Sequence, residues 1–252
     1  MKLSAAIITF NEEKNIGRCL DSLKGIADEI VVVDSFSKDN TEGICKQHNV
    51  RFIPHGFEGH IQQKNYAISQ TSGDWVISLD ADEALSNELR GAILMIKHAP
   101  EANGYQMNRL TNYCGHWVKY CGWYPDTKVR LIRKGFAEWR GINPHDRLDM
   151  QDNANVVHLK GDILHYSYYS VEDHLKQIEY FGNIAAKELF SRGKTSGWML
   201  IIVKVVAQFI KSYFLKLGML DGATGFTISR LSAFATYRKY YKLMQLNKGK
   251  KI

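Results

Sequence analysis

Apolar runs and amphipathic stretches alternate through the first hundred residues. Short runs rich in β-branched residues predict buried strands at Leu3–Phe10, Glu29–Val33, Val50–Ile53 and Asp74–Leu79. Stretches with apolar positions three and four residues apart predict helices at Thr41–His48, Gln62–Ser72, Asn87–His98 and after Asn11. Strands that alternate with helices form parallel sheets with right-handed crossovers, so we expect a doubly wound α/β sheet.

The pattern changes after this first part of the chain. Aromatic residues and glycines crowd between residues 103 and 165, with strand-like runs at Lys128–Ile132 and Val156–Leu159, so we expect mixed or antiparallel strands and long loops there. Three helices are expected beyond this region, at about residues 171–191, 197–217 and 226–246. We therefore expect an α/β domain over residues 1–168, in halves 1–100 and 101–168, and a helical region over residues 169–252.

Charge is unevenly distributed along the chain. Residues 191–252 carry 12 lysine or arginine residues against one acid, Asp221, whereas residues 1–190 carry 25 acidic and 21 basic residues. The formal net charge of the whole chain is +7. A basic C-terminal region on a mildly acidic body predicts a polyanionic partner, either nucleic acid or anionic lipid.

The expected helix at 197–217 decides between these two partners. Its polar residues form one stripe, about 140° wide at about 100° per residue: Lys204, Gln208, Lys211, Ser212 and Lys216. Lysine interrupts the apolar run before the roughly 20 residues that a membrane-spanning helix needs. A basic stripe beside a broad apolar face is typical of a helix in a membrane interface, and it argues against nucleic acid. Packing against the body, or against another copy of the chain in a homo-oligomer, is the alternative.

The cysteines and the N-terminus indicate the compartment. The cysteines form no C-x-x-C pair and match no zinc or disulfide spacing: Cys19, Cys45, Cys114 and Cys121. Reduced cysteines suit the cytoplasm. The first apolar run is short and is followed by Asn11 and two glutamates, so we expect no signal peptide. We expect a cytoplasmic protein that binds peripherally to the inner face of an anionic membrane.

Two carboxylates follow the fourth predicted strand directly, in the motif Asp80-Ala81-Asp82. In open parallel sheets, ligands gather outside the carboxyl ends of the strands. Divalent cations such as Mg²⁺ bind one or two carboxylates together with substrate phosphates. The motif therefore predicts a site for Mg²⁺ or Mn²⁺, although a solvated turn before the next helix has the same pattern.

Polar side chains also follow the other predicted strands. Asn11 and Glu12 follow the first strand, and Asp34 and Asp39 follow the second. We expect these groups to meet at one sheet edge and to hydrogen-bond a base and a ribose. Lys64, on the helix before the fourth strand, is expected near a phosphate. The chain lacks the glycine fingerprint of dinucleotide sites.

Four motifs resemble, in this order and spacing, the nucleotide-sugar domain of family 2 glycosyltransferases: ITFNEEKNI, EIVVVDSFSKDNT, QQKNYAI and WVISLDADE. The resemblance implies the GT-A fold and transfer with inversion. It also implies that Asp34 binds uracil, that Asp39 binds the ribose side, and that Asp80 and Asp82 form the metal and diphosphate motif. Residues 1–100 would then bind the nucleotide sugar and residues 101–168 the acceptor.

Later motifs resemble a subgroup, the lipopolysaccharide core β-1,4-glucosyltransferase-like proteins: GWYPDTKVRLIRK, EWRGINPHDRL, His165-Tyr166 and KLGMLDGATGF. Inverting transfer needs a base that deprotonates the acceptor hydroxyl. The subgroup has His-Glu after Trp-x-Gly, whereas this chain has Pro144-His145-Asp146. The resemblance implies Asp146 as the base, with His145 as the alternative. A surface ion pair of Asp146 with Arg140 or Arg147 would leave the role to another residue.

Other candidate residues each have a functional and a structural interpretation. His165 would be a third metal ligand, as a histidine is in some related GT-A enzymes, or a structural histidine at a strand end. Trp123 and Tyr124 would stack on an acceptor sugar or belong to a local core. Arg130, which we assign to acceptor binding, and Arg133 would contact phosphates or lie on a solvated strand face.

The sequence thus predicts a metal-dependent, inverting hexosyltransferase of the bacterial cytoplasm. Its donor would be a UDP-sugar, with glucose as the expected hexose. Its acceptor would be a saccharide or glycolipid hydroxyl, as in the lipopolysaccharide core. The alternatives are a polyprenyl-phosphate sugar transferase, whose acceptor is a phosphate, and a non-catalytic membrane scaffold with the same fold.

Overall fold

The computed structural model describes the backbone of residues 1–142 and 145–252 and the side chains of residues 1–141 and 146–252. This part of the chain forms two compact units. The first unit comprises Met1–Leu110 and Asp126–Tyr166, and the second comprises Thr111–Pro125 and Ser167–Ile252. The expected division after residue 168 therefore differs from the structure in the segment Thr111–Pro125, which belongs to the second unit.

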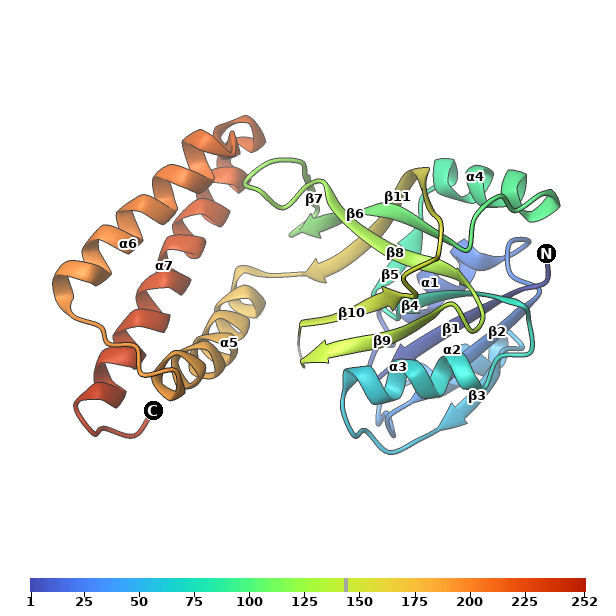
Figure 1. Ribbon diagram of the computed structural model, residues 1–252, viewed down its shortest axis with the longest axis horizontal. Coiled ribbons are helices and arrows are strands. Elements are labelled where there is room, and N and C mark those ends of the chain that lie inside the picture. Colours follow the sequence, from blue (N-terminus) through green and yellow to red (C-terminus); the bar gives the residue numbers. More distant parts are fainter. Residues whose placement is uncertain (143–144) are drawn as a thin grey trace. The chain divides into compact units, whose positions relative to one another are not determined.

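The main sheet of the first unit begins with parallel strands in the order β3-β2-β1-β4 (Figure 1). These strands are β1 Leu3–Thr9, β2 Glu29–Asp34, β3 Arg51–Pro54 and β4 Trp75–Asp80. The helices around them are α1 Ile16–Leu23, α2 Thr41–Gln47, α3 His60–Ser69 and α4 Asn87–His98. The alternation of strands and helices read from the sequence is therefore present, and the central strands are mostly apolar because both sheet faces are covered.

Strand β1 shows how the two faces are filled. Successive strand residues point to opposite faces. Leu3, Ala5 and Ile7 are fully buried in the larger apolar cluster, which also contains residues of α1 and α4. Ala6 belongs to the second cluster, together with Ala67 of α3. The strand is thus held on both sides, and its carboxyl end is fixed beside that of β4.

Antiparallel strands continue the sheet beyond β4, in the order β8-β6-β11-β5. Their bounds are β5 Glu83–Leu85, β6 Gly104–Tyr113, β8 Asp126–Arg133 and β11 Val156–Tyr168, and β7 His116–Val118 pairs with β6. A separate hairpin consists of β9 Ala137–Ile142 and β10 His145–Met150. The sequence located only parts of β8 and β11, because the apolar alternation in this region is short and interrupted by aromatic residues and glycines.

The second unit is mainly helical. Its helices are α5 Val171–Ser191, α6 Trp198–Ile210 and α7 Gly222–Asn247, and α7 packs against both of the others (Figure 1). The single helix expected at 197–217 is interrupted: a π-helical turn covers Lys211–Leu215, and Leu217 has a φ of 53°. The left-handed conformation of Leu217 ends the helix, since it cannot continue a right-handed one.

The run KLGMLDGATGF forms the joint before α7. The Asp221 carboxylate accepts hydrogen bonds from the backbone N–H of Tyr120 at 2.9 Å and from Nε2 of His116 at 3.2 Å. A Cβ atom on Gly225 would lie 1.8 Å from the carbonyl oxygen of Gly218, so this close approach requires glycine. The run therefore has a structural role within the second unit.

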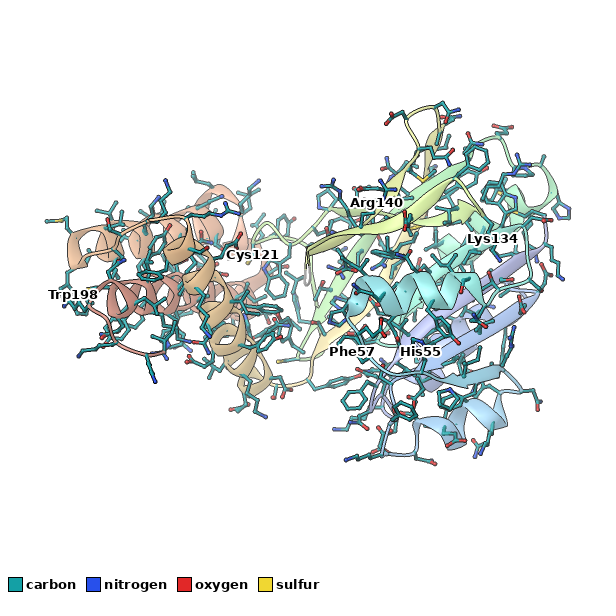
Figure 2. All side chains as sticks on the ribbon, turned by 60° about the horizontal axis from the view of Figure 1, so that its bottom comes forward. His55, Phe57, Cys121, Lys134, Arg140 and Trp198 are labelled. Carbon is teal, nitrogen blue, oxygen red and sulfur yellow. The ribbon has the colours of Figure 1, made fainter. Side chains whose placement is uncertain are left out.

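Helix α6 and the π-helical turn that follows it expose a broad apolar surface. Met199 and Leu215 are 77% and 73% exposed, and Trp198 lies exposed at the start of the helix (Figure 2). The stretch Trp198–Leu215 has a mean hydropathy of 1.6, and only 11% of it is buried. It is long and apolar enough to cross a membrane by length and composition alone. Contiguous exposed apolar surface of this kind marks an interaction site.

Candidate active site

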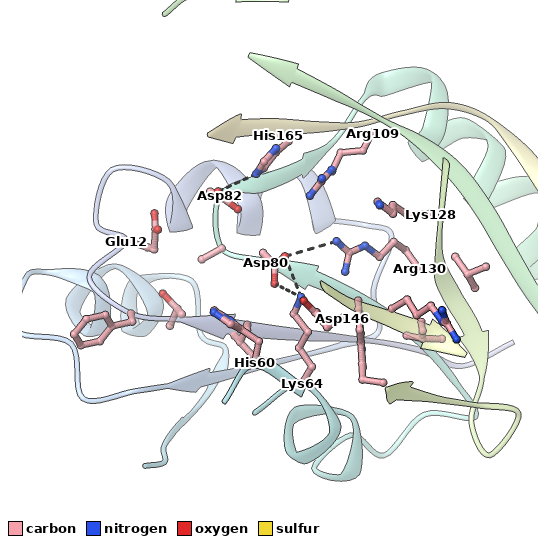
Figure 3. A pocket seen from close by; sticks show the side chains of 18 of the residues that line it. Glu12, His60, Lys64, Asp80, Asp82, Arg109, Lys128, Arg130, Asp146 and His165 are labelled. Carbon is pink, nitrogen blue, oxygen red and sulfur yellow. Dashed lines mark hydrogen bonds and ion pairs between the residues drawn. The ribbon is translucent and has the colours of Figure 1, made fainter. Parts of the chain in front are cut away.

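A cavity of about 1170 Å³ lies in the first unit, at the carboxyl ends of β1 and β4 and against β6, β8 and β10 (Figure 3). Eight of the residues expected from the sequence line it: Glu12, Lys64, Asp80, Ala81, Asp82, Arg130, Asp146 and His165. They come from both expected halves of the α/β domain. The cavity therefore joins the predicted nucleotide-binding residues to the predicted base.

Lys64 lies between two carboxylates of the cavity. Its Nζ atom is 2.8 Å from Oδ2 of Asp146 and 3.1 Å from Oδ1 of Asp80. The lysine is 5% exposed, and its ammonium group lies 4.3 Å from the centre of the Trp139 ring. A buried ammonium group is costly unless it is paired, and here two acids and an aromatic face pair it.

The structure shows whether Asp146 forms a surface ion pair with Arg140 or Arg147, the alternative that the sequence left open. Arg140 pairs with Glu138 at 3.0 Å, and Arg147 pairs with Asp149 at 2.5 Å. Asp146 instead faces the cavity and pairs with a lysine there. Asp146 therefore does not form a surface ion pair with either neighbouring arginine.

Asp80 lies among cations and beside a second buried acid. Nη2 of Arg130 is 3.6 Å from its carboxylate, and its backbone N–H donates to Oε2 of Glu83 at 3.0 Å. Burial alone would raise the pKa of Asp80, but the charges of Lys64 and Arg130 lower it below its ordinary value. Asp80 is thus held as a carboxylate.

Asp82 pairs with His165 on β11. Nε2 of His165 is 3.2 Å from Oδ2 of Asp82, and the Asp82 carbonyl accepts the backbone N–H of Tyr166 at 2.9 Å. Burial would lower the pKa of His165, but the Asp82 carboxylate raises it, and the balance lies above the ordinary value. The His165 ring and the Asp82 carboxylate are therefore held together.

Asp80, Asp82 and His165 are the candidate ligands of a divalent metal in this cavity. Among the described side chains, no three His, Cys, Asp or Glu groups form a ready-made metal site. Asp82 and His165 nevertheless offer an oxygen and a nitrogen donor to the same cavity. Oδ1 of Asp80 is buried and makes no hydrogen bond of suitable geometry. Two adjacent donors and a carboxylate oxygen with spare capacity fit Mg²⁺ or Mn²⁺ completed by substrate phosphates.

Glu12 adds a fourth acid to the cavity. Its Oε2 atom accepts a hydrogen bond from Nδ2 of Asn15 at 2.7 Å. Burial raises the pKa of Glu12 to about 6, and the negative charges of Asp82 and Asp39 act in the same direction. Glu12 therefore ionises less readily than an exposed glutamate, chiefly because it is buried.

Three expected nucleotide-binding residues organise loops beside the cavity and do not line it. Oδ1 of Asn11 accepts the backbone N–H of Lys38 at 2.8 Å, and Oδ2 of Asp39 accepts that of Glu13 at 3.0 Å. Asp34, at the end of β2, is 3% exposed. Asn11 and Asp39 thus join the loop after β1 to the loop after β2.

The expected aromatic platform lies elsewhere. Trp123 and Tyr124 belong to the second unit and do not line the cavity. Within that unit, the Trp123 ring packs 5.9 Å from Tyr113, 5.7 Å from Tyr168 and 6.0 Å from His174. Trp123 therefore has the local-core role that the sequence left open.

Arg133 does not line the cavity. Arg133 is exposed and lies 5.5 Å from the Phe136 ring, so the guanidinium covers an apolar side chain. Pro144 and the side chain of His145 lie outside the described residues. The alternative base is therefore a prediction that the cavity does not test.

A model of the family described as Glycosyl transferase family 2 matches residues 4–154 of this chain. The chain belongs to this family. The resemblance read from the four N-terminal motifs is therefore confirmed. The GT-A class is also confirmed, since parallel strands β3-β2-β1-β4 are followed by antiparallel strands and a helical C-terminal region.

Relatives of this family 2 glycosyltransferase match nearly its whole length. An uncharacterized glycosyltransferase of Rickettsia typhi is 33% identical over 98% of this chain and 88% of its own. The lipopolysaccharide core biosynthesis glycosyltransferase LpsC of Rhizobium meliloti is 26% identical over 95% of this chain and 93% of its own.

Two solved structures illustrate the similarity of fold. S. aureus TarS 1-349 in complex with UDP matches 99% of this chain and 92% of its own, with 16% identity and a TM-score of 0.47. Glucosyl-3-phosphoglycerate synthase of Mycobacterium tuberculosis with Mn²⁺, UDP and glucosyl-3-phosphoglycerate has 22% identity and a TM-score of 0.36. That match covers 44% of each chain, so this chain spans less than half of the synthase.

Sequence reasoning missed three groups around the cavity of the glycosyltransferase. Glu83, which ends the motif DADE, is 1% exposed, and its Oε1 atom accepts a hydrogen bond from Nη2 of Arg130 at 3.0 Å. Arg109 and Trp139 line the cavity from β6 and β9. The position of Glu83 beside the apolar residues Ala84 and Leu85 could have indicated that this acid is buried. A buried acid needs a cationic partner.

We predict that Glu83→Ala destabilises the first unit far more than Glu138→Ala does. Glu83 is buried between Arg130 and the backbone of Asp80, and removing one partner of a buried pair costs about 3–5 kcal/mol. Glu138 pairs with Arg140 on the surface, where loss of a pair costs about 0–1 kcal/mol. Urea unfolding of both variants measures the difference, and equal losses would contradict the role given to Glu83.

Proposed function

We propose that this family 2 glycosyltransferase transfers a hexose, with glucose as the first candidate, from a UDP-sugar to a hydroxyl of a lipid-linked saccharide with inversion. The supporting observation is that Asp80, Asp82, Lys64 and Asp146 line one cavity at the carboxyl ends of parallel strands. Ligands of open α/β sheets bind at this edge. Similarity to LpsC, named for lipopolysaccharide core biosynthesis, supports the acceptor class.

The donor would lie across the ends of β2, β1 and β4. Asn11, Asp34 and Asp39 belong to the two joined loops, and we propose that these loops hold the uracil and the ribose. Lys64 would face the diphosphate, because its ammonium group lies nearer to Asp80 than the Arg130 guanidinium does. An ammonium group opposite phosphate oxygens stabilises the charge that develops as UDP leaves.

Asp82 and His165 would hold the divalent metal, Mg²⁺ or Mn²⁺. A bound metal of this kind neutralises negative charge on a leaving diphosphate. The chain's own contribution is to aim the two donors at one point and to keep Asp80 ionised beside them.

Asp146 would act as the general base. Its carboxylate takes the proton of the acceptor hydroxyl while the acceptor oxygen bonds to C1 of the hexose and the bond from C1 to the phosphate oxygen breaks. Lys64 orients this carboxylate through the 2.8 Å hydrogen bond to Oδ2. A phosphate acceptor needs no base, so a carboxylate in the cavity favours a hydroxyl acceptor over a polyprenyl phosphate.

We propose further that the second unit holds the enzyme on the cytoplasmic side of an anionic membrane. Residues 191–252 contain 12 basic residues and one acid, and α6 exposes a broad apolar face. An apolar face and a basic surface are two signals that together anchor a protein peripherally. At such a location the enzyme would be close to a lipid-linked acceptor.

The donor proposal predicts metal-dependent UDP binding through Asp82. In Asp82→Ala, the affinity for UDP with Mn²⁺ should fall to the value that wild type shows with excess chelator, because a metal ligand is lost. Asp21→Ala, which changes an exposed acid of α1, should behave as wild type. Titration calorimetry measures all three, and chelator-independent UDP affinity in wild type would sink the metal assignment.

The base proposal predicts a loss of turnover without a loss of donor binding. Hydrolysis of UDP-glucose, with water as acceptor, should fall about 10²–10⁴-fold in Asp146→Asn, while the Kd of UDP stays near wild type. Asp149→Asn on the same strand is the matched control, since Asp149 pairs with Arg147. Turnover at the wild-type rate in Asp146→Asn would move the base to another residue.

The membrane proposal predicts that the protein floats with phosphatidylglycerol vesicles, and that high salt reduces this binding without abolishing it. The double variant Met199→Glu, Leu215→Glu should lose binding, because charges replace two exposed apolar residues of the second unit. Met95→Glu on α4, where Met95 is 78% exposed, is the control. Absence of flotation at low salt would leave this apolar surface as a contact between copies of the chain.

A further inference from the structure

The described lining of the cavity is divided by charge. Its carboxylates are Glu12, Asp80, Asp82 and Asp146, and none of them belongs to β6 or β8. These two strands instead contribute three cations, namely Arg109, Lys128 and Arg130. Figure 3 shows the three cations together on the side of Asp80 that lies away from Glu12. We call Arg109, Lys128 and Arg130 the cationic wall.

The acids that lie nearest to the cationic wall do not line the cavity. Asp126 pairs with Arg109 and with Lys128, each at 2.9 Å. Glu83 pairs with Arg130 at 3.0 Å and lies 3.6 Å from Arg109. Three cations thus share these two carboxylates, and among the described residues only Arg130 also approaches an acid of the lining, Asp80, at 3.6 Å. A molecule in the cavity meets the positive charges first.

Arg130 has hydrogen-bonding capacity that the protein does not use. It is 3% exposed, and neither Nε nor Nη1 has a hydrogen-bond partner among the described residues. Its guanidinium lies 5.0 Å from the Trp139 ring, so one face is covered by an aromatic surface. Buried N–H groups without partners cost free energy, which an oxyanion in the cavity would recover.

Lys128 extends this capacity along β8. Lys128 and Arg130 both line the cavity, at a place where a β-bulge interrupts the regular alternation of β8. The strand therefore presents a pair of cations to the cavity. Arg109 reaches the same acids from β6. In the sheet order, β8 and β6 lie beyond β4 on the side away from β1 and β2. The cationic wall therefore faces the part of the cavity that the donor nucleoside does not occupy.

We propose that the cationic wall recognises an oxyanion on the acceptor, so that the acceptor is an anionic saccharide bearing a phosphate or a carboxylate near the hydroxyl that reacts. This inference rests on the proposed function, because it assumes that the donor occupies the acidic side. Guanidinium and ammonium groups bind both kinds of oxyanion, and guanidinium does so with two parallel hydrogen bonds. A neutral saccharide would leave the Arg130 donors unpaired.

The test titrates sugar probes into the full-length protein saturated with UDP and Mn²⁺. The probes are glucose, glucose 6-phosphate, glucuronate and inorganic phosphate. At least one anionic sugar should bind about tenfold or more tightly than glucose, since one charge-assisted hydrogen bond is worth that factor. The stronger of the two anionic sugars identifies the oxyanion as phosphate or carboxylate.

Variants assign the effect to the wall. Lys128→Gln should weaken the anionic sugar about tenfold and leave the Kd of UDP unchanged. Lys46→Gln is the matched control, because Lys46 pairs with Glu42 at 2.8 Å on α2 and does not line the cavity. It should change neither affinity.

Several results would overturn the inference while the proposed function stands. In each of these results wild type binds UDP. Glucose then binds as tightly as its anionic analogues, or inorganic phosphate binds as tightly as glucose 6-phosphate, or no probe binds measurably. Loss of UDP affinity in Lys128→Gln, equal to the loss for the anionic sugar, would assign the wall to the donor and also overturn it. Absence of UDP binding to wild type would instead contradict the proposed function itself.

Discussion

A buried ammonium group joins the parts of the cavity that come from distant regions of the chain. Lys64 on α3 lies 3.1 Å from Asp80 at the end of β4 and 2.8 Å from Asp146 on β10. The neighbouring Asn65 exchanges two hydrogen bonds of 2.9 Å with the backbone of Trp139 on β9. The β9–β10 hairpin is therefore fixed on α3, and the lysine requires both acids because a buried charge without partners is costly. Two acids so close to each other equally require the lysine.

This arrangement makes the two sides of the cavity chemically different. The acidic side suits a metal and a diphosphate, and its single lysine is shared by two carboxylates. The side formed by β6 and β8 presents cations whose partner acids stand outside the lining. A transferase must hold a donor and an acceptor at once, and the division of charge gives each substrate its own surface in the account proposed here.

Much of the parallel half could be predicted from the sequence. Buried strands in a doubly wound sheet are continuous apolar runs, and the polar residues that follow Leu79 and Phe10 fall at the carboxyl edge by geometry. The motif Asp80-Ala81-Asp82 therefore placed the cavity before any contact was known. Asp146 was indicated only through the family resemblance, since nothing in its local pattern distinguishes it from a surface acid.

Other features depend on contacts between distant residues, which no local pattern encodes. Trp123 packs with aromatic residues of the second unit because the segment Thr111–Pro125 belongs to that unit. Glu83 is buried because Arg130, 47 positions later, reaches it. The end of the expected helix at Leu217 follows from its positive φ, which the apolar periodicity does not reveal. Sequence periodicity thus gives elements and their edges, while the pairing of charges requires the fold.

The central claim is that this cavity binds a uridine diphosphate sugar donor. It is tested most directly by thermal unfolding of the full-length protein with UDP, GDP, ADP or CDP, each with Mn²⁺. A ligand at a hundred times its Kd stabilises the folded state by about 2.7 kcal/mol. We expect UDP to raise the unfolding midpoint clearly and the other nucleotides to raise it little, with the effect lost in chelator. Equal shifts for all four nucleotides, or no shift with UDP, would contradict the account.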